Sequence, residues 1–194
     1  MDKWDERYKL SNMVELEEGF FATEVLDNGN GKSLKRGRGG QRKTKTLVMV
    51  ETMEGITSKK NHKYTAIRHT KMIIIDVRSA KTIDPEVKEF IESSSTIISD
   101  ESTYYTNYKP IVTSHCSQVI PKEKVDQSIL WVHIAINNAK RLFLDVYHDL
   151  CHDYIQNYLS EFFSKFNHRT MGNVMFNRLV VAKLGYNYSF KYII

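Results

Sequence analysis

The chain has 194 residues, 41% of them hydrophobic and 26% charged, and a formal net charge of +5. This length fits one domain, and the composition is ordinary for a globular protein, which excludes a wholly disordered chain. No apolar run approaches the roughly 18–20 residues that span a bilayer, and the N-terminus, MDKWDE, lacks the apolar core of a signal peptide. These features exclude membrane proteins and secreted disulfide scaffolds, so Cys116 and Cys151 are expected to be thiols of an intracellular protein.

Three strands are predicted in the first part of the chain. They cover residues 13–25 (MVELEEGFFATEV), 46–51 (TLVMVE) and 64–77, which end in KMIIIDV. Short apolar runs rich in valine and isoleucine are typical of strands. The last of the three has the longest apolar run, so we expect it to be the most deeply buried.

The net positive charge is concentrated between the first and third strands. From Lys32 to Lys71 the chain has twelve basic and two acidic residues. Within this stretch, residues 31–40 read GKSLKRGRGG, which is typical of a flexible loop. Long cationic side chains on such a loop suit a phosphate backbone, because binding releases condensed counterions. A solvated surface loop is the alternative, since a basic patch is a footprint of nucleic-acid binding but no proof of it.

A helix is predicted to open at residues 82–86, TIDPE. Asp84 suits the N-cap and Pro85 suits the first helical position, where its missing N–H costs nothing. Beyond this helix the apolar patterns predict, in chain order, a strand over 95–99, a short helix over 101–108, a short strand over 112–119, and helices over 130–146, 154–166 and 174–184.

The order of these elements indicates a mixed α/β layer fold. It is also the order of an RNase H-like domain, although several mixed-sheet folds share it. We expect a central mixed five-stranded sheet with helices packed on it and a helical C-terminal part. The whole chain, 1–194, is then one domain, with a core over about 10–148 and C-terminal helices over 149–194.

Two sets of carboxylates are candidates for chemistry. Asp100 ends the predicted fourth strand, and ligands of open α/β sheets gather at the carboxyl ends of strands. Capping of the following helix is the simpler role for it. In the first strand, alternation puts Glu15 and Glu17 on one face and Glu18 on the other. At least one of these acids points toward packed helices, where it needs a cation or another partner.

His133 and Lys140 are seven residues apart on a predicted helix, so both project from one face. A partly buried histidine and a solvated Lys140–Arg141 pair are the simpler interpretation. Together with an acid on the first strand and Asp100, however, His133 would complete a two-metal site for phosphodiester chemistry. Carboxylate oxygens favour Mg²⁺ or Mn²⁺, and the imidazole tilts the choice toward Mn²⁺.

Seven segments of the chain resemble one family: VELEEGFF (14–21), KRGRGGQRKTKTLVMVE (35–51), KMIIIDV (71–77), ISDESTYY (98–105), QVIPKEKV (118–125), WVHIAINNAKRLFLDVYH (131–148) and YLSEFFSKFNHR (158–169). On these segments the chain resembles the catalytic domain of bacterial DDE-type insertion-sequence transposases of the ISXO-like group. The resemblance covers roughly residues 10–184.

The resemblance implies an RNase H-like fold and metal-dependent cleavage and strand transfer at the ends of an insertion sequence. It implies that Glu17, Asp100 and His133 bind two Mg²⁺ or Mn²⁺ ions and that Lys140 contacts a phosphate near the reacting end. It also implies DNA as the partner, homo-oligomers on DNA and a place at the bacterial nucleoid in the cytoplasm. The DNA-contacting residues that follow from it are Lys35, Arg36, Arg38, Arg42, Lys43, Lys45, Lys140 and Arg141.

The sequence departs from the family pattern in two ways. Glu17 stands where the family has aspartate, and one extra methylene shifts a metal that needs placement within a fraction of an ångström. The N-terminal zinc ribbon and helix-turn-helix of the family are missing, which suggests a truncated reading frame, a separately encoded domain or a fragment. The alternative function is therefore an impaired remnant that binds only DNA or transposase subunits. A third hypothesis, an RNase H-like nuclease acting on RNA or hybrids, predicts cleavage without strand joining.

Overall fold

A computed structural model describes residues 7–23, 43–57, 62–75, 79–100, 112, 114–118, 129–147 and 150–184. The elements in chain order are β1 (Met13–Ala22), β2 (Lys43–Thr57), β3 (His62–Ile74), α2 (Ala80–Phe90), β4 (Thr96–Asp100), β5 (Ser114–Gln118), α4 (Leu130–Val146), the short 3₁₀ helix η2 (His152–Tyr154), α5 (Ile155–Asn167) and α6 (Val174–Leu184). In this part of the chain, no helix has both the length and the apolar character needed to cross a membrane.

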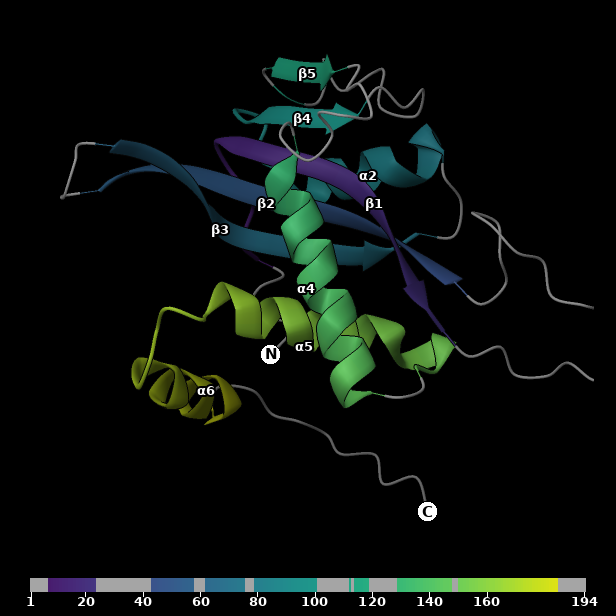
Figure 1. The fold of residues 1–194 in the computed structure, drawn as a ribbon, viewed down its shortest axis with the longest axis vertical. Helices are drawn as coiled ribbons and strands as arrows, with labels where there is room; N and C mark the ends of the chain where they lie inside the picture. Colours follow the sequence, from purple (N-terminus) through teal and green to yellow (C-terminus); the bar gives the residue numbers. More distant parts are fainter. Residues whose placement is uncertain are drawn as a thin grey trace, which may run out of the picture.

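The five strands form one mixed sheet in the order β3-β2-β1-β4-β5 (Figure 1). The pairs β1–β2 and β2–β3 are antiparallel, and the pairs β1–β4 and β4–β5 are parallel. A meander of three strands therefore continues into two parallel strands, the first of which follows α2. This arrangement confirms the predicted mixed α/β fold of the RNase H-like type.

Strand alternation divides the interior into two cores, one on each face of the sheet. On one face, Val14 and Leu16 of β1 pack with Ile83 and Val87 of α2. On the other face, Phe21 of β1 packs with residues of α4 and α5. Figure 1 shows α4 crossing the sheet on this second face. The first strand is thus covered on both sides, which places any polar side chain within it under a helix.

A side chain at Gly19 would crowd its neighbours in the core. A Cβ atom built at this position would lie 3.1 Å from the Phe21 ring, 3.4 Å from Val48 and 3.6 Å from Ile136 of α4. Only the distance to Phe21 is clearly shorter than ordinary contact. The glycine in the middle of β1 therefore leaves room for the Phe21 ring of the same strand.

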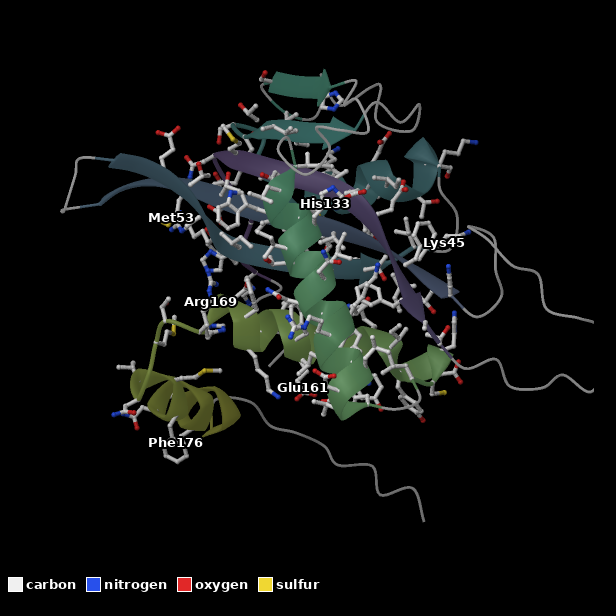
Figure 2. The ribbon with its side chains drawn as sticks, in the orientation of Figure 1. Lys45, Met53, His133, Glu161, Arg169 and Phe176 are labelled. Atoms are coloured by element: carbon white, nitrogen blue, oxygen red, sulfur yellow. The ribbon has the colours of Figure 1, made fainter. Side chains whose placement is uncertain are left out.

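The free edge of β3 is covered by polar side chains from α5 and from the residues just after it. Gln156 accepts the Ile74 N–H at 2.9 Å and donates to the Met72 carbonyl at 2.9 Å. Asn167 accepts the Thr70 N–H at 2.7 Å and donates to the Thr70 carbonyl at 3.0 Å. Arg169 donates to the Ile67 carbonyl at 2.6 Å, and Figure 2 shows it at the end of α5 beside β3. These bonds satisfy backbone groups that an edge strand otherwise leaves open.

The helices over 130–146 and 174–184 have the predicted bounds, and the helix expected over 154–166 is α5, shifted by one residue. The strand β2 extends further than predicted at both ends, whereas β3 begins two residues earlier than predicted and ends at Ile74 rather than at 77. Thr57 pairs with His62 across a long polar hairpin. Apolar patterns do not reveal pairing of this kind. The short helix expected over 101–108 and the basic loop over 31–40 lie outside the described residues.

The predicted start of the helix that follows the third strand, at residues 82–86, was wrong. Helix α2 begins at Ala80 with Ser79 as its N-cap residue, so Asp84 is inside the helix and does not cap it. Pro85 also lies inside the helix rather than at its first position. The earlier start brings the fully buried Ile83 into the helix, where it packs under the sheet. This packing outweighs the local preference of the Asp-Pro pair.

Candidate functional site

The central pair of the candidate site joins the first strand to the first C-terminal helix. Glu17 on β1 faces α4, and its Oε2 lies 3.2 Å from Nδ1 of His133. Their side chains are 24% and 25% exposed, but Oε2 of Glu17 and Nε2 of His133 are themselves buried. Figure 2 shows His133 near the start of α4, over the sheet. Two residues that the sequence put forward from positions 116 apart are therefore in contact.

Glu15 lies one alternation before Glu17, on the same face of β1. Its Oε2 accepts the Trp131 N–H at 2.8 Å and the Val132 N–H at 2.9 Å. Burial raises the pKa of the Glu15 carboxyl above its usual value, and the two backbone hydrogen bonds oppose that rise. This is the inward acid that the strand pattern required to have a partner, and its partner is the start of α4.

Asp100 is the last residue of β4, which pairs with β1 in parallel. The register matches Leu16 with Ser99, so the next step along both strands brings Asp100 level with Glu17. The backbone therefore puts both acidic positions level with each other on adjacent strands. The side chain of Asp100 lies outside the described part of the structure. Among the described side chains, no three metal-ligating residues gather in one group.

The basic candidates are divided between described and undescribed parts of the chain. Lys140 and Arg141 lie on α4, with Lys140 partly buried and Arg141 exposed. Lys140 is seven residues beyond His133, about 10 Å along the helix axis at a rise of ~1.5 Å per residue. Lys43 and Lys45 lie on β2, whereas Lys35, Arg36, Arg38 and Arg42 are outside the described residues.

A second buried carboxylate, Glu51 on β2, was not singled out from the sequence. Its Oε1 receives hydrogen bonds from Ser11 at 2.9 Å and Arg68 at 3.2 Å. Its Oε2 receives one from Tyr8 at 2.8 Å and lies 3.3 Å from Nδ1 of His69. Its partners are up to 43 residues away in the chain, so no local pattern indicated them. It lies on the α2 face of the sheet, away from Glu17, because it pairs with Val14.

Within the Glu51 cluster, the pKa of the carboxyl and the pKa of the Tyr8 hydroxyl are shifted in opposite directions. Burial raises the pKa of the Glu51 carboxyl, but hydrogen bonds from His69, Tyr8 and Ser11 outweigh that effect and leave the pKa below its usual value. Burial and the neighbouring Glu51 raise the pKa of Tyr8 to about 12. The cluster is therefore a stable anion held by donors, and it attaches residues 8–11 to the sheet.

Comparison with known proteins identifies the family. A chain in the crystal structure of a pre-cleavage Mos1 transpososome is similar at 11% identity and a TM-score of 0.38, over 91% of this chain and 56% of that one. This chain thus spans little more than half of that chain's length, and a likeness of this size adds no argument. A search of curated proteins finds no match. The family model described as ISXO2-like transposase domain matches residues 9–167, and the chain therefore belongs to this family of DDE-type insertion-sequence transposases.

Proposed function

We propose that this domain cleaves DNA strands and transfers them at the ends of an insertion sequence, in a reaction that depends on divalent metal ions. Glu17, Asp100 and His133 are the proposed metal ligands. The observation that carries the proposal is the 3.2 Å contact between Glu17 and His133, in the middle of β1 at a position level with the end of β4. Membership of the transposase family supports it.

The residues present suit such ions. Glu17 contributes carboxylate oxygens and His133 an imidazole nitrogen, a donor set that fits Mg²⁺ or Mn²⁺. Ile98, two residues before Asp100, packs on the α4 side of the sheet, and alternation assigns position 100 to that same face. Two bound divalent ions supply activation of a water or 3′-hydroxyl and stabilisation of the leaving oxygen. The chain itself supplies the placement of these donors.

The proposed partner is DNA, bound by a homo-oligomer of this chain. Lys140 is proposed to contact a phosphate near the reacting end, two turns along α4 from His133, with Arg141 beside it. Lys43 and Lys45 continue the basic stretch of the sequence into β2. Cationic side chains at these positions would orient the DNA without reading its sequence. The domain organisation proposed with this function is one catalytic domain with a core over about 10–148.

The same contact also favours a second function. Glu17 stands where the family has aspartate, and its longer side chain reaches His133 directly. A Glu17–His133 ion pair that takes the place of bound metal would leave an impaired remnant, which binds only DNA or other transposase subunits. The two functions differ in what happens when the side chain at position 17 is shortened.

The test is a cleavage and strand-transfer assay on labelled element ends with Mg²⁺ or Mn²⁺. We expect products from the wild type and a loss on the order of 10²-fold or more in Asp100→Ala, because the placement of reacting groups is lost. Asp145→Ala, a change of an exposed carboxylate on α4, is the matched control and should leave the rate unchanged.

Glu17→Asp decides between the two functions. If the wild type is inactive and Glu17→Asp raises cleavage on the order of 10²-fold, the natural chain is the impaired remnant. If neither protein yields products with either ion, while both bind DNA, the catalytic proposal is overturned. RNA cleavage without joining would instead support a nuclease.

A further inference from the structure

Glu15 forms a connection between the centre of β1 and the start of α4. Its side chain is 6% exposed. Its Oε2 accepts two consecutive backbone N–H groups, from Trp131 and Val132. These donors are 116 and 117 residues away along the chain, so the contact is a tertiary one.

The first turn of α4 has no local cap of its own. The first four N–H groups of a helix lack partners within the helix, and a side chain at the N-cap position commonly accepts one of them. At α4 the N-cap residue is Ile129, which offers no side-chain cap, and the first turn holds no acidic residue. Glu15 therefore does from the sheet what a capping residue does from the helix itself. An anion there also interacts favourably with the helix dipole.

This connection bears directly on the candidate site. His133 follows Val132 immediately, and it contacts Glu17, which follows Glu15 by one alternation on the same face. One strand thus holds both the start of the helix and the partner of His133. Any axial slide or rotation of the first turn of α4 would move the His133 imidazole relative to Glu17.

We propose that Glu15 is a positioning residue: its carboxylate fixes the first turn of α4 and so holds His133 beside Glu17. The importance of this role for the reaction rests on the proposed function. Glu15 does not itself bind metal or DNA in this scheme, because its Oε2 is engaged by the two amides. A displacement of about 1 Å at a reacting group can cost on the order of 10²-fold in rate.

The test compares three variants. Glu15→Ala removes both hydrogen bonds, whereas Glu15→Gln keeps an oxygen that can accept them. Asn167→Ala is the matched control, because Asn167 is also buried and also makes two hydrogen bonds to a distant backbone, that of Thr70. It destabilises the fold without touching β1 or α4.

The first readout needs neither metal nor DNA. Nuclear magnetic resonance follows amide exchange at Trp131 and Val132 and the ring signals of His133, and Glu17→Ala gives the ring signals of a lost contact. In Glu15→Ala we expect exchange at both amides to accelerate at least tenfold and the His133 signals to move toward those of Glu17→Ala. Glu15→Gln and Asn167→Ala should keep the wild-type ring signals. Unchanged ring signals in Glu15→Ala, or equal changes in Asn167→Ala, would overturn the proposal.

The second readout is steady-state cleavage of element ends. In Glu15→Ala we expect kcat to fall on the order of 10²-fold with little change in KM for DNA, and Glu15→Gln to recover most of the rate. An equal loss of kcat in Asn167→Ala would reduce Glu15 to a structural role and overturn the proposal. An inactive wild type would overturn the proposed function alone, since the resonance readout still decides the position of His133.

Discussion

Glu15 and Glu51 are buried carboxylates on neighbouring strands, but they face opposite sides of the sheet. Glu15 is held by two backbone amides of one helix, and its pKa lies above the usual value. Glu51 is held by side chains from two separate segments, residues 8–11 and β3, and its pKa lies below the usual value. The comparison teaches that donors, and not burial alone, decide in which direction the pKa of a buried acid moves.

The two acids also differ in what depends on them. Around Glu51 four donor side chains share one carboxylate, so all four lose their common partner if Glu51 is removed. Around Glu15 the helix α4 is held by its own apolar residues as well, among them Val132, Ile136 and Phe143. We therefore expect Glu51 to matter more for stability and Glu15 more for the placement of the site.

The largest expected effect comes from Glu51→Ala. It leaves the Arg68 guanidinium and the Tyr8 and Ser11 hydroxyls without their acceptor, so we expect the free energy of unfolding to fall by about 3–5 kcal/mol. Urea unfolding followed by circular dichroism measures it. Glu54→Ala, at an exposed position of the same strand, should change little. A loss below about 1 kcal/mol for Glu51→Ala would show that these donors are satisfied by water.

A smaller loss of stability is expected for Glu15→Ala. Two helix N–H groups lose their acceptor, which costs about 1–2 kcal/mol for a typical cap. The same urea experiment provides the value. A loss as large as that of Glu51→Ala would break the distinction between the two acids, because it would mean that α4 depends on its cap more than on its apolar face.

The smallest expected effect is a change in pH dependence. A carboxyl whose pKa is lowered by folding contributes stability above its unfolded value, here 4.5, and loses it as pH falls through the lower folded value. In Glu51→Gln this contribution is absent at every pH. The stability gap between wild type and Glu51→Gln should therefore narrow as the pH falls below 4.5, in urea titrations at a series of pH values. A gap that widens on acidification would reverse the assigned direction of the Glu51 pKa.

Much of the fold follows from local patterns. The helix α4 has the predicted bounds because its apolar residues repeat at helical spacing over 17 residues. The start of α2 could not be predicted, because the local signal of Asp84 and Pro85 competes with the burial of Ile83 against the sheet. Packing of this kind depends on the finished sheet and leaves no trace in a short window.

The candidate site was predictable only in part. Strand alternation indicated that Glu15 and Glu17 share one face and that at least one acid of this strand faces packed helices, and His133 was placed near the start of its helix. The expectation that Glu17 and His133 lie close together followed from the family resemblance, which implied both as ligands of one site, and the structure brings them into contact. The role of Glu15 as a cap for α4 had no signal in the sequence, apart from the expectation that an acid facing the helices needs a partner. The assignment of metal ligands and DNA contacts stays a prediction.

The cover that Gln156, Asn167 and Arg169 place over β3 has a consequence for assembly. A strand from another copy could extend the sheet at β3 only by displacing these side chains from the backbone of residues 67–74. Growth of the sheet by strand addition is therefore blocked on this side, at bonds that are already made within the chain. In the proposed assembly on DNA, copies of the chain would therefore meet through surfaces other than this edge.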